Sequence, residues 1–169
     1  MSASLFDSCV PALTLGLTNL AAILDKGAAH AEAKKLDPKV LPGSRLIADM
    51  FPLSRQVQIV CDTAKGAAGR LAGVELPKHE DTETTIEELK ARIAKTLAFI
   101  NGIKPAQFAG AEGRDIELKF PRQTLKFTGS DYVHKFVLPN FYFHITATYA
   151  ILRSNGVELG KNDYLGAIQ

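Results

Sequence analysis

The fold of this chain is decided by the stretch Leu138-Pro-Asn-Phe-Tyr-Phe-His-Ile-Thr-Ala-Thr-Tyr-Ala-Ile-Leu-Arg-Ser-Asn-Gly156. The stretch predicts one helix, because Pro139 stands where a first turn tolerates proline and Gly156 stands where helices commonly stop. Its apolar residues occupy nearly the whole circumference, and a helix that is apolar on two sides is usually buried on two sides. One side is expected to face a helical bundle, so the other needs a second covering element.

Two polar residues, Asn140 and His144, interrupt this apolar surface, and their spacing of four places them on one helix face. An unpaired amide or imidazole in such a place costs on the order of 1–3 kcal/mol. The partners that could satisfy them are each other, a glutamine of an earlier helix, water or a ligand. The pair is therefore either a hydrogen-bonded inclusion in a core or part of a binding site.

Two earlier segments have the apolar spacing of three and four residues that is typical of helices. The first runs from about Ser4 to Ala29, and Pro11 within it predicts a kink or a delayed start. The second runs from Pro52 to about Ala72. Gly66 and Gly69 in the second segment would let another helix approach closely.

A third helix is predicted after a polar connection. The residues Thr84 to Glu88 contain two overlapping capping boxes, each with a threonine followed three residues later by a glutamate. The helix is expected to end at Asn101-Gly102. Its charged face, which includes Arg92, is expected to be solvated.

A β-hairpin is predicted before the last helix. The stretches Asp115–Phe120 and Thr124–Thr128 alternate between apolar and polar residues, and Pro121-Arg-Gln123 between them predicts the loop. A final helical region then runs to a break at Pro139. These elements predict an all-α fold, a four-helix bundle with a small β-hairpin inserted before the last helix. At 169 residues, the chain is expected to be one domain covering residues 1–169.

Charge and composition exclude several classes of function. The chain has 20 basic and 18 acidic residues, and its longest basic run is Lys34-Lys35. Nucleic-acid binders usually gather their basic residues on one face, so we expect neither nucleic acid nor a membrane as partner. No window approaches about 18 unbroken apolar residues, and the N-terminus lacks the basic region of a signal peptide.

The two cysteines, Cys9 and Cys61, form no metal-binding or redox spacing. We expect two free thiols in a reducing compartment, and hence a cytoplasmic protein.

Four segments carry a resemblance to a known family: Asp49-Met-Phe-Pro-Leu53, Gln56-Val-Gln-Ile-Val-Cys-Asp62, Leu138-Pro-Asn-Phe-Tyr-Phe-His144 and Ile151-Leu-Arg-Ser-Asn-Gly-Val157. The chain resembles a bacterial family of unknown function within the DinB/YfiT-like superfamily. The resemblance implies a four-helix bundle, often dimeric, over essentially the whole chain. Many superfamily members hold a divalent metal with one histidine on the second helix and two histidines, four apart, on the last.

Only part of that ligand set is present in this sequence. His144 matches the last ligand, and Asn140 stands at the position four residues earlier. The position on the second helix falls at Gln58 or, with a shifted alignment, at Gln56. We therefore expect a degenerate metal site, a polar pocket of these four residues that holds no cofactor.

Two functions follow from this interpretation. The first is a small-molecule-binding protein or a structural dimer. The second is an enzyme in which His144 holds a divalent metal such as zinc or nickel, of the thiol-transferase or hydrolase type that the resemblance implies, or acts alone as an acid or base. We expect a homodimer through the second apolar side of the last helix, with an interface that includes Phe141, Tyr142, Ile145, Tyr149 and Leu152.

Overall fold

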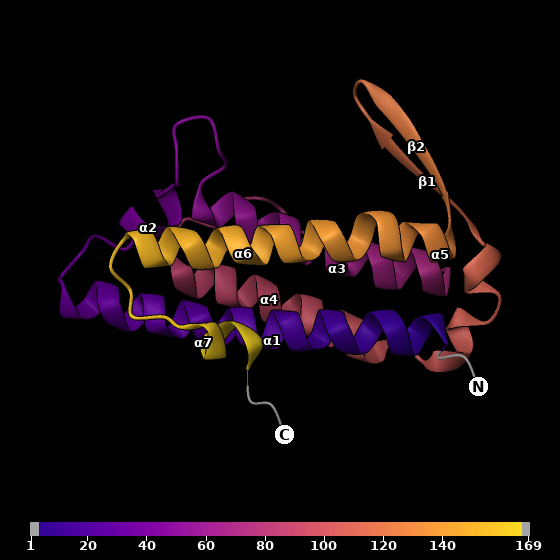
Figure 1. The fold of residues 1–169 in the computed structure, drawn as a ribbon, viewed down its shortest axis with the longest axis horizontal. Coiled ribbons are helices and arrows are strands. Elements are labelled where there is room, and N and C mark those ends of the chain that lie inside the picture. Colours follow the sequence, from indigo (N-terminus) through magenta and orange to yellow (C-terminus); the bar gives the residue numbers. More distant parts are fainter. Residues whose placement is uncertain (1–3, 167–169) are drawn as a thin grey trace.

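Four long helices form a bundle in the computed structural model, which describes residues 4–166 (Figure 1). They are α1 (Leu5–Ala33), α3 (Leu53–Ala72), α4 (Ile86–Gly102) and α6 (Leu138–Ser154). Helix α3 packs against α4 and α6, and α1 packs against the same two helices from the other side. The shorter elements are α2 (Val40–Gly43), η1 (Pro105–Phe108), η2 (Ala111–Gly113), β1 (Asp115–Phe120), β2 (Gln123–Thr128), α5 (Gly129–Asp131), η3 (Tyr132–Val137) and α7 (Lys161–Leu165). The predicted all-α bundle with an inserted hairpin is confirmed.

Helix α1 begins at Leu5 with a capping box between Ser4 and Asp7, and it continues through Pro11. The predicted delayed start is therefore wrong. Pro11 lies on the exposed side of the helix, where water can reach the carbonyl group that its ring deprives of a partner. By length and composition alone α1 could cross a membrane, with a mean hydropathy of 1.4. Its Leu13 and Leu17 are fully buried in the bundle, and a core helix of a soluble protein passes the same test.

The last helix is longer than predicted, because no break occurs at Pro139. The elements α5, η3 and α6 follow one another without a gap, and η3 is a π-helical turn. In this turn the N–H of Leu138 donates to the carbonyl of Val133, five residues earlier. A π turn accommodates one extra residue within a helical column, and such turns are frequent at functional sites.

The hairpin rises from one end of the bundle (Figure 1). Its strands pair antiparallel, from Asp115 opposite Thr128 to Phe120 opposite Gln123. The loop is therefore Pro121-Arg122, one residue shorter than predicted. The alternation that predicted the hairpin is present, since Ile116 and Leu118 are buried while Asp115, Glu117 and Lys119 beside them are exposed.

The second apolar side of the last helix is covered within the chain. Phe141, Ile145 and Leu152 are buried, because α1 approaches α6 closely along Gly16 and Gly27. The tail supplies α7, whose Tyr164 packs edge-on against Tyr149, while Tyr149 donates a hydrogen bond to the Leu159 carbonyl. Of the five residues predicted for a dimer interface, Tyr142 is exposed, Tyr149 is partly buried, and Phe141, Ile145 and Leu152 are buried within the chain. The sequence did not indicate this cover, because the tail shows no strong helical period of its own.

Candidate functional site

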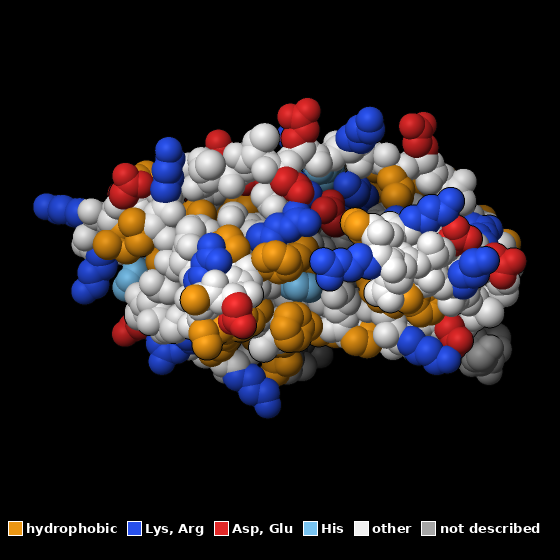
Figure 2. Space-filling view, turned by 90° about the horizontal axis from the view of Figure 1, so that it is seen from above, with side chains coloured by type: hydrophobic (Ala, Val, Ile, Leu, Met, Phe, Trp, Pro, Cys, Tyr) orange, Lys and Arg blue, Asp and Glu red, His pale blue; other side chains and the backbone are white. Residues whose placement is uncertain are grey.

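A cleft of ≈ 430 Å³ lies along the seam between α3 and α6. Asn140 and His144 line it from α6, and Leu118 and Phe120 of the hairpin line it from the side. On the face of the molecule seen in Figure 2, a histidine side chain comes to the surface among hydrophobic side chains, with Lys and Arg side chains close by. The cleft therefore combines a polar seam with apolar walls.

His144 is held by a chain of two hydrogen bonds. Its Nδ1 lies 2.6 Å from Oε1 of Gln56, and Nε2 of Gln56 donates to the Phe51 carbonyl at 3.1 Å. The Phe51 carbonyl can only accept, so the amide nitrogen of Gln56 must face it and the amide oxygen must face the imidazole. Nδ1 of His144 therefore carries the proton, and Nε2 keeps a lone pair.

The surroundings of His144 keep its ring neutral. Burial lowers the pKa of His144 below its ordinary value, and the positive charge of Arg55 lowers this pKa further. Among the described residues, none donates a hydrogen bond to Nε2. A neutral imidazole with a fixed lone pair can accept a hydrogen bond, take up a proton or bind a metal.

Asn140 has a partner of its own on α3. Its Nδ2 donates to Oγ1 of Thr63 at 2.9 Å. The pairs Asn140–Thr63 and His144–Gln56 thus cross the same seam in antiparallel order. The structure brings together Gln56, Asn140 and His144 of the predicted pocket.

The fourth predicted residue, Gln58, lies elsewhere. Its Nε2 donates to Glu83 at 3.0 Å, and its Oε1 accepts from Arg55 at 3.1 Å. Two residues along a helix turn the side-chain direction by about 200°, so Gln56 and Gln58 cannot share one face. Gln58 therefore does not line the α3–α6 cleft.

Arg92 was expected to be solvated, yet it is 2 % exposed. Its guanidinium lies 2.9 Å from Asp62, 3.0 Å from Asp81 and 3.0 Å from Glu83. Sequence periodicity missed this arginine because its three methylene groups carry the guanidinium from the polar edge of α4 across to the preceding loop. The only sequence signal was the acidic run in that loop.

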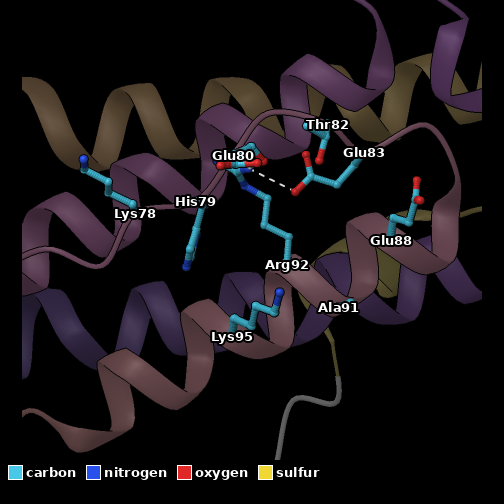
Figure 3. Close-up of a pocket in the computed structure, with 9 residues that line it drawn as sticks. All are labelled: Lys78, His79, Glu80, Thr82, Glu83, Glu88, Ala91, Arg92 and Lys95. Carbon is cyan, nitrogen blue, oxygen red and sulfur yellow. Dashed lines mark hydrogen bonds and ion pairs between the residues drawn. The ribbon is translucent and has the colours of Figure 1, made fainter.

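Arg92 stands in the wall of a second cleft, of ≈ 510 Å³, between α4 and the loop that precedes it. Figure 3 shows Arg92 extending from α4 to the loop, with His79 projecting from the loop and Lys95 from α4. The Nε of Arg92 and the Nδ1 of His79 are buried without a hydrogen-bond partner among the described residues. The ion pairs of Arg92 with Asp81 and Glu83, and its hydrogen bond to the Glu80 carbonyl, fasten the loop to α4.

Neither cysteine provides a reactive thiol. Cys9 and Cys61 are both free and buried. Burial raises the pKa of each thiol to about 12, so both stay protonated and unreactive at neutral pH.

The donor atoms near His144 do not fit a divalent metal. No cluster of three or more His, Cys, Asp or Glu side chains that could hold one occurs within residues 4–166. The carboxylate that lines the cleft, Asp62, is bound by Arg92 and by Lys65. The amide oxygen of Gln56 is directed at Nδ1 of His144, and amides are weak ligands of transition metals in any case.

Comparison with known proteins places the chain in a family. Residues 5–165 match the family described as "Domain of unknown function (DUF1993)". A crystal structure of a DinB family member from Shewanella denitrificans is similar over 97% of this chain and 93% of that one, with 50% sequence identity and a TM-score of 0.89. No curated protein matches the chain. The chain therefore belongs to the DUF1993 family and is a DinB-like protein.

Proposed function

We propose that this protein binds a small organic molecule in the α3–α6 cleft and does so without a metal. The observation that carries the proposal is the fixed tautomer of His144, a residue that lines the cleft and whose Nε2 lone pair has no hydrogen-bond partner among the described residues. Small-molecule sites are concave, largely apolar and equipped with a few well-placed polar groups. The α3–α6 cleft has this composition.

Four aromatic side chains besides His144 line the cleft. Phe51 and Phe120 are about half exposed, and Phe136 and Tyr132 belong to the π-helical turn. Exposed aromatic rings at a cleft mark a place where a ligand can remove apolar surface from water. Buried partners hold His144 and Asn140 in place, so the site is largely formed before a ligand arrives.

The proposal can be tested by NMR, with the ¹⁵N signals of His144 as reporter. Aromatic fragments that bind the cleft should shift the Nε2 signal, because Nε2 accepts a hydrogen bond from the bound ligand or is shielded by its ring. Replacement of the cleft residue Ile59 by Trp should abolish these shifts by filling the space. Fragments that bind the protein yet leave Nε2 unchanged would place the binding site elsewhere.

A metal-dependent enzyme is the second candidate. One observation favours it: metal-binding histidines usually donate their second ring N–H to a protein oxygen, as His144 does to Gln56. The donor set described above argues against it. Protein purified without chelators or an affinity tag should contain metal far below one equivalent, and stoichiometric zinc or nickel that is lost in His144→Ala would favour the enzyme.

We also propose that the chain forms a homodimer, through a surface that shares Tyr142 with the predicted interface. The exposed apolar surface beside the cleft contains Ile47 at 60%, Phe143 at 58%, Leu46 at 42% and Tyr142 at 40% exposure. A groove lined by Leu46, Met50 and Phe143 among others runs through this surface. Continuous exposed apolar surface of this kind is typical of protein contacts.

A further inference from the structure

The α3–α6 cleft contains a cation whose charge has no partner. Arg70 lines the cleft, and its Nη1 donates to the hydroxyl of Tyr132 at 3.1 Å. No carboxylate within the described part of the chain lies within 4.0 Å of its guanidinium. A guanidinium has five N–H donors, so most of those of Arg70 remain available.

A glycine makes room for this guanidinium. A Cβ on Gly66 would overlap Nη1 of Arg70 and would lie 3.4 Å from its Cζ. The arginine therefore folds back over the preceding turn of α3, toward Thr63 and Asn140. Gly66 was expected to admit a neighbouring helix, and besides the side chain of Arg70 it faces the Tyr132 hydroxyl of η3, which would lie 3.7 Å from the added Cβ.

The other charges on this side of α3 balance one another. The cations Arg55, Lys65 and Arg92 are paired with the anions Asp62, Asp81 and Glu83. Asp62 also lines the cleft, but its charge is shared between Arg92 and Lys65.

Arg70 is thus the surplus cation of the cleft. A surplus cation in a partly buried cleft attracts an anion from solution.

The space between Arg70 and the polar seam is walled by stacked rings. Tyr132 and Phe136 lie with centroids 5.9 Å apart and planes inclined by 14°. Phe127 of the hairpin packs against both rings, at 5.9 Å from each. Aromatic ligands pack favourably on such a wall.

The folded Arg70 side chain sets the length of the site. Gly66, over which the guanidinium lies, is three residues from Thr63 and ten from Gln56, or about 4.5 Å and about 15 Å along the helix axis. A ligand that places an anionic group at Arg70 and a hydrogen-bond donor at Asn140 or His144 is therefore elongated.

We infer that the cleft takes an aromatic acid, with its anionic group on Arg70, its ring against Phe136 and a hydroxyl or N–H group directed at the polar seam. This inference rests on the proposed function, because it names the ligand class of the same cleft. Charge-assisted hydrogen bonds to the guanidinium of Arg70 would make the cleft bind the acid more tightly than a neutral molecule of the same shape.

Two dyes that share one ring system test the inference. 8-Anilinonaphthalene-1-sulfonate has an aromatic amine and an anionic group, and N-phenyl-1-naphthylamine has the same aromatic amine without the anionic group. Fluorescence titration should show that the wild-type protein binds the anionic dye about ten-fold more tightly or better. Gly66→Ala and Arg70→Gln should each remove this preference while leaving the affinity for the neutral dye within about two-fold.

Matched variants control for general effects. Gly102→Ala adds a methyl group where nothing lies within 4 Å, and Arg153→Gln removes an arginine that bonds the Val157 carbonyl near the end of α6. Both controls should keep the preference. Gly66→Ala is informative even if Arg70→Gln folds poorly, because the added methyl group only displaces the mobile end of a side chain.

The outcomes separate the inference from the proposed function. If both dyes bind, Ile59→Trp abolishes both, and the two α3 variants change neither, then the cleft binds small molecules but Arg70 does not select acids. If Ile59→Trp leaves the binding of both dyes intact, then the dyes bind outside the cleft and the proposed function itself is contradicted.

Discussion

Nδ1 of His144 lies 2.6 Å from Oε1 of Gln56, across the seam between the last and second long helices of the bundle. Gln56 is 1 % exposed and His144 is 8 % exposed, so the bond forms largely out of water. Because Gln56 is anchored in turn to the Phe51 carbonyl, the bond fixes both the tautomer and the direction of the imidazole.

The first prediction concerns the pKa of His144. Gln56→Glu places a carboxylate where the amide oxygen stands, and a nearby negative charge favours the imidazolium. The pKa of His144 should rise relative to wild type, in a titration followed by NMR of the ring protons. An unchanged pKa would mean that the bond between the two side chains does not form in solution.

The second prediction concerns the pH dependence of stability. The pKa of His144 is lowered in the folded state, so the unfolded chain binds the proton more tightly. Neutral His144 therefore contributes fully to the free energy of unfolding above the ordinary histidine pKa of about 6.5. This contribution is lost progressively as the pH falls from about 6.5 toward the pKa of His144 in the folded state. Below that value, the contribution no longer changes.

Urea unfolding at several pH values between neutrality and mild acid can measure this effect. His79 also has a lowered pKa and acts in the same direction, so wild type should be compared with His144→Leu. The difference in slope between the two proteins is the contribution of His144. Equal slopes would contradict the prediction.

The third prediction concerns Arg92. Arg92→Met leaves Asp62, Asp81 and Glu83 close together without their shared cation. Breaking a buried ionic cluster from one side costs about 3 kcal/mol, and the partial exposure of the carboxylates keeps the loss from being larger. Amide hydrogen exchange of residues 79–84 should accelerate, since Arg92 also bonds the Glu80 carbonyl.

Lys90→Met is the matched control for this change. Lys90 pairs with Asp25 at the surface, where both side chains are substantially exposed. Such pairs contribute about 0–1 kcal/mol. Equal losses of unfolding free energy in the two variants would show that the buried Arg92 cluster stabilises the fold no more than the exposed pair of Lys90 and Asp25.

The fourth prediction concerns the junction between the hairpin and the last helix. A Cβ on Gly129 would overlap the backbone carbonyl of Ala111, which cannot move aside as a side chain can. Gly129→Ala should therefore destabilise the fold by about 1–3 kcal/mol or more. Gly102→Ala, which meets nothing within 4 Å, should change the midpoint of urea unfolding little.

The fifth prediction concerns self-association. Phe143→Asp places a charge within the exposed apolar surface proposed for the dimer. Sedimentation at micromolar concentration should show a dimer for wild type and a monomer for the variant. A monomeric wild-type protein would contradict the proposed dimer.

The sequence by itself determined the elements of this fold. Helix periodicity and capping are local properties, so the four long helices and the hairpin could be predicted from a few neighbouring residues at a time. The same local pattern singled out Asn140 and His144, because two polar groups on an apolar face are visible without knowing what covers that face.

Tertiary structure decided which groups meet across the bundle. The rotation of α3 about its axis directs Gln56 toward His144 and Gln58 toward Glu83. The two side chains differ in direction by about 200°, and the local sequence pattern does not indicate which of them faces the last helix. The docking of α7 and α1 covered Phe141, Ile145 and Leu152, three of the residues that were expected to meet a second copy.

Long side chains show the same limit. Arg70 folds back over Gly66, and Arg92 reaches from α4 to the preceding loop. The position of each guanidinium depends on where its partners lie in space, several bonds away from its own backbone, and only the packed structure supplies those positions.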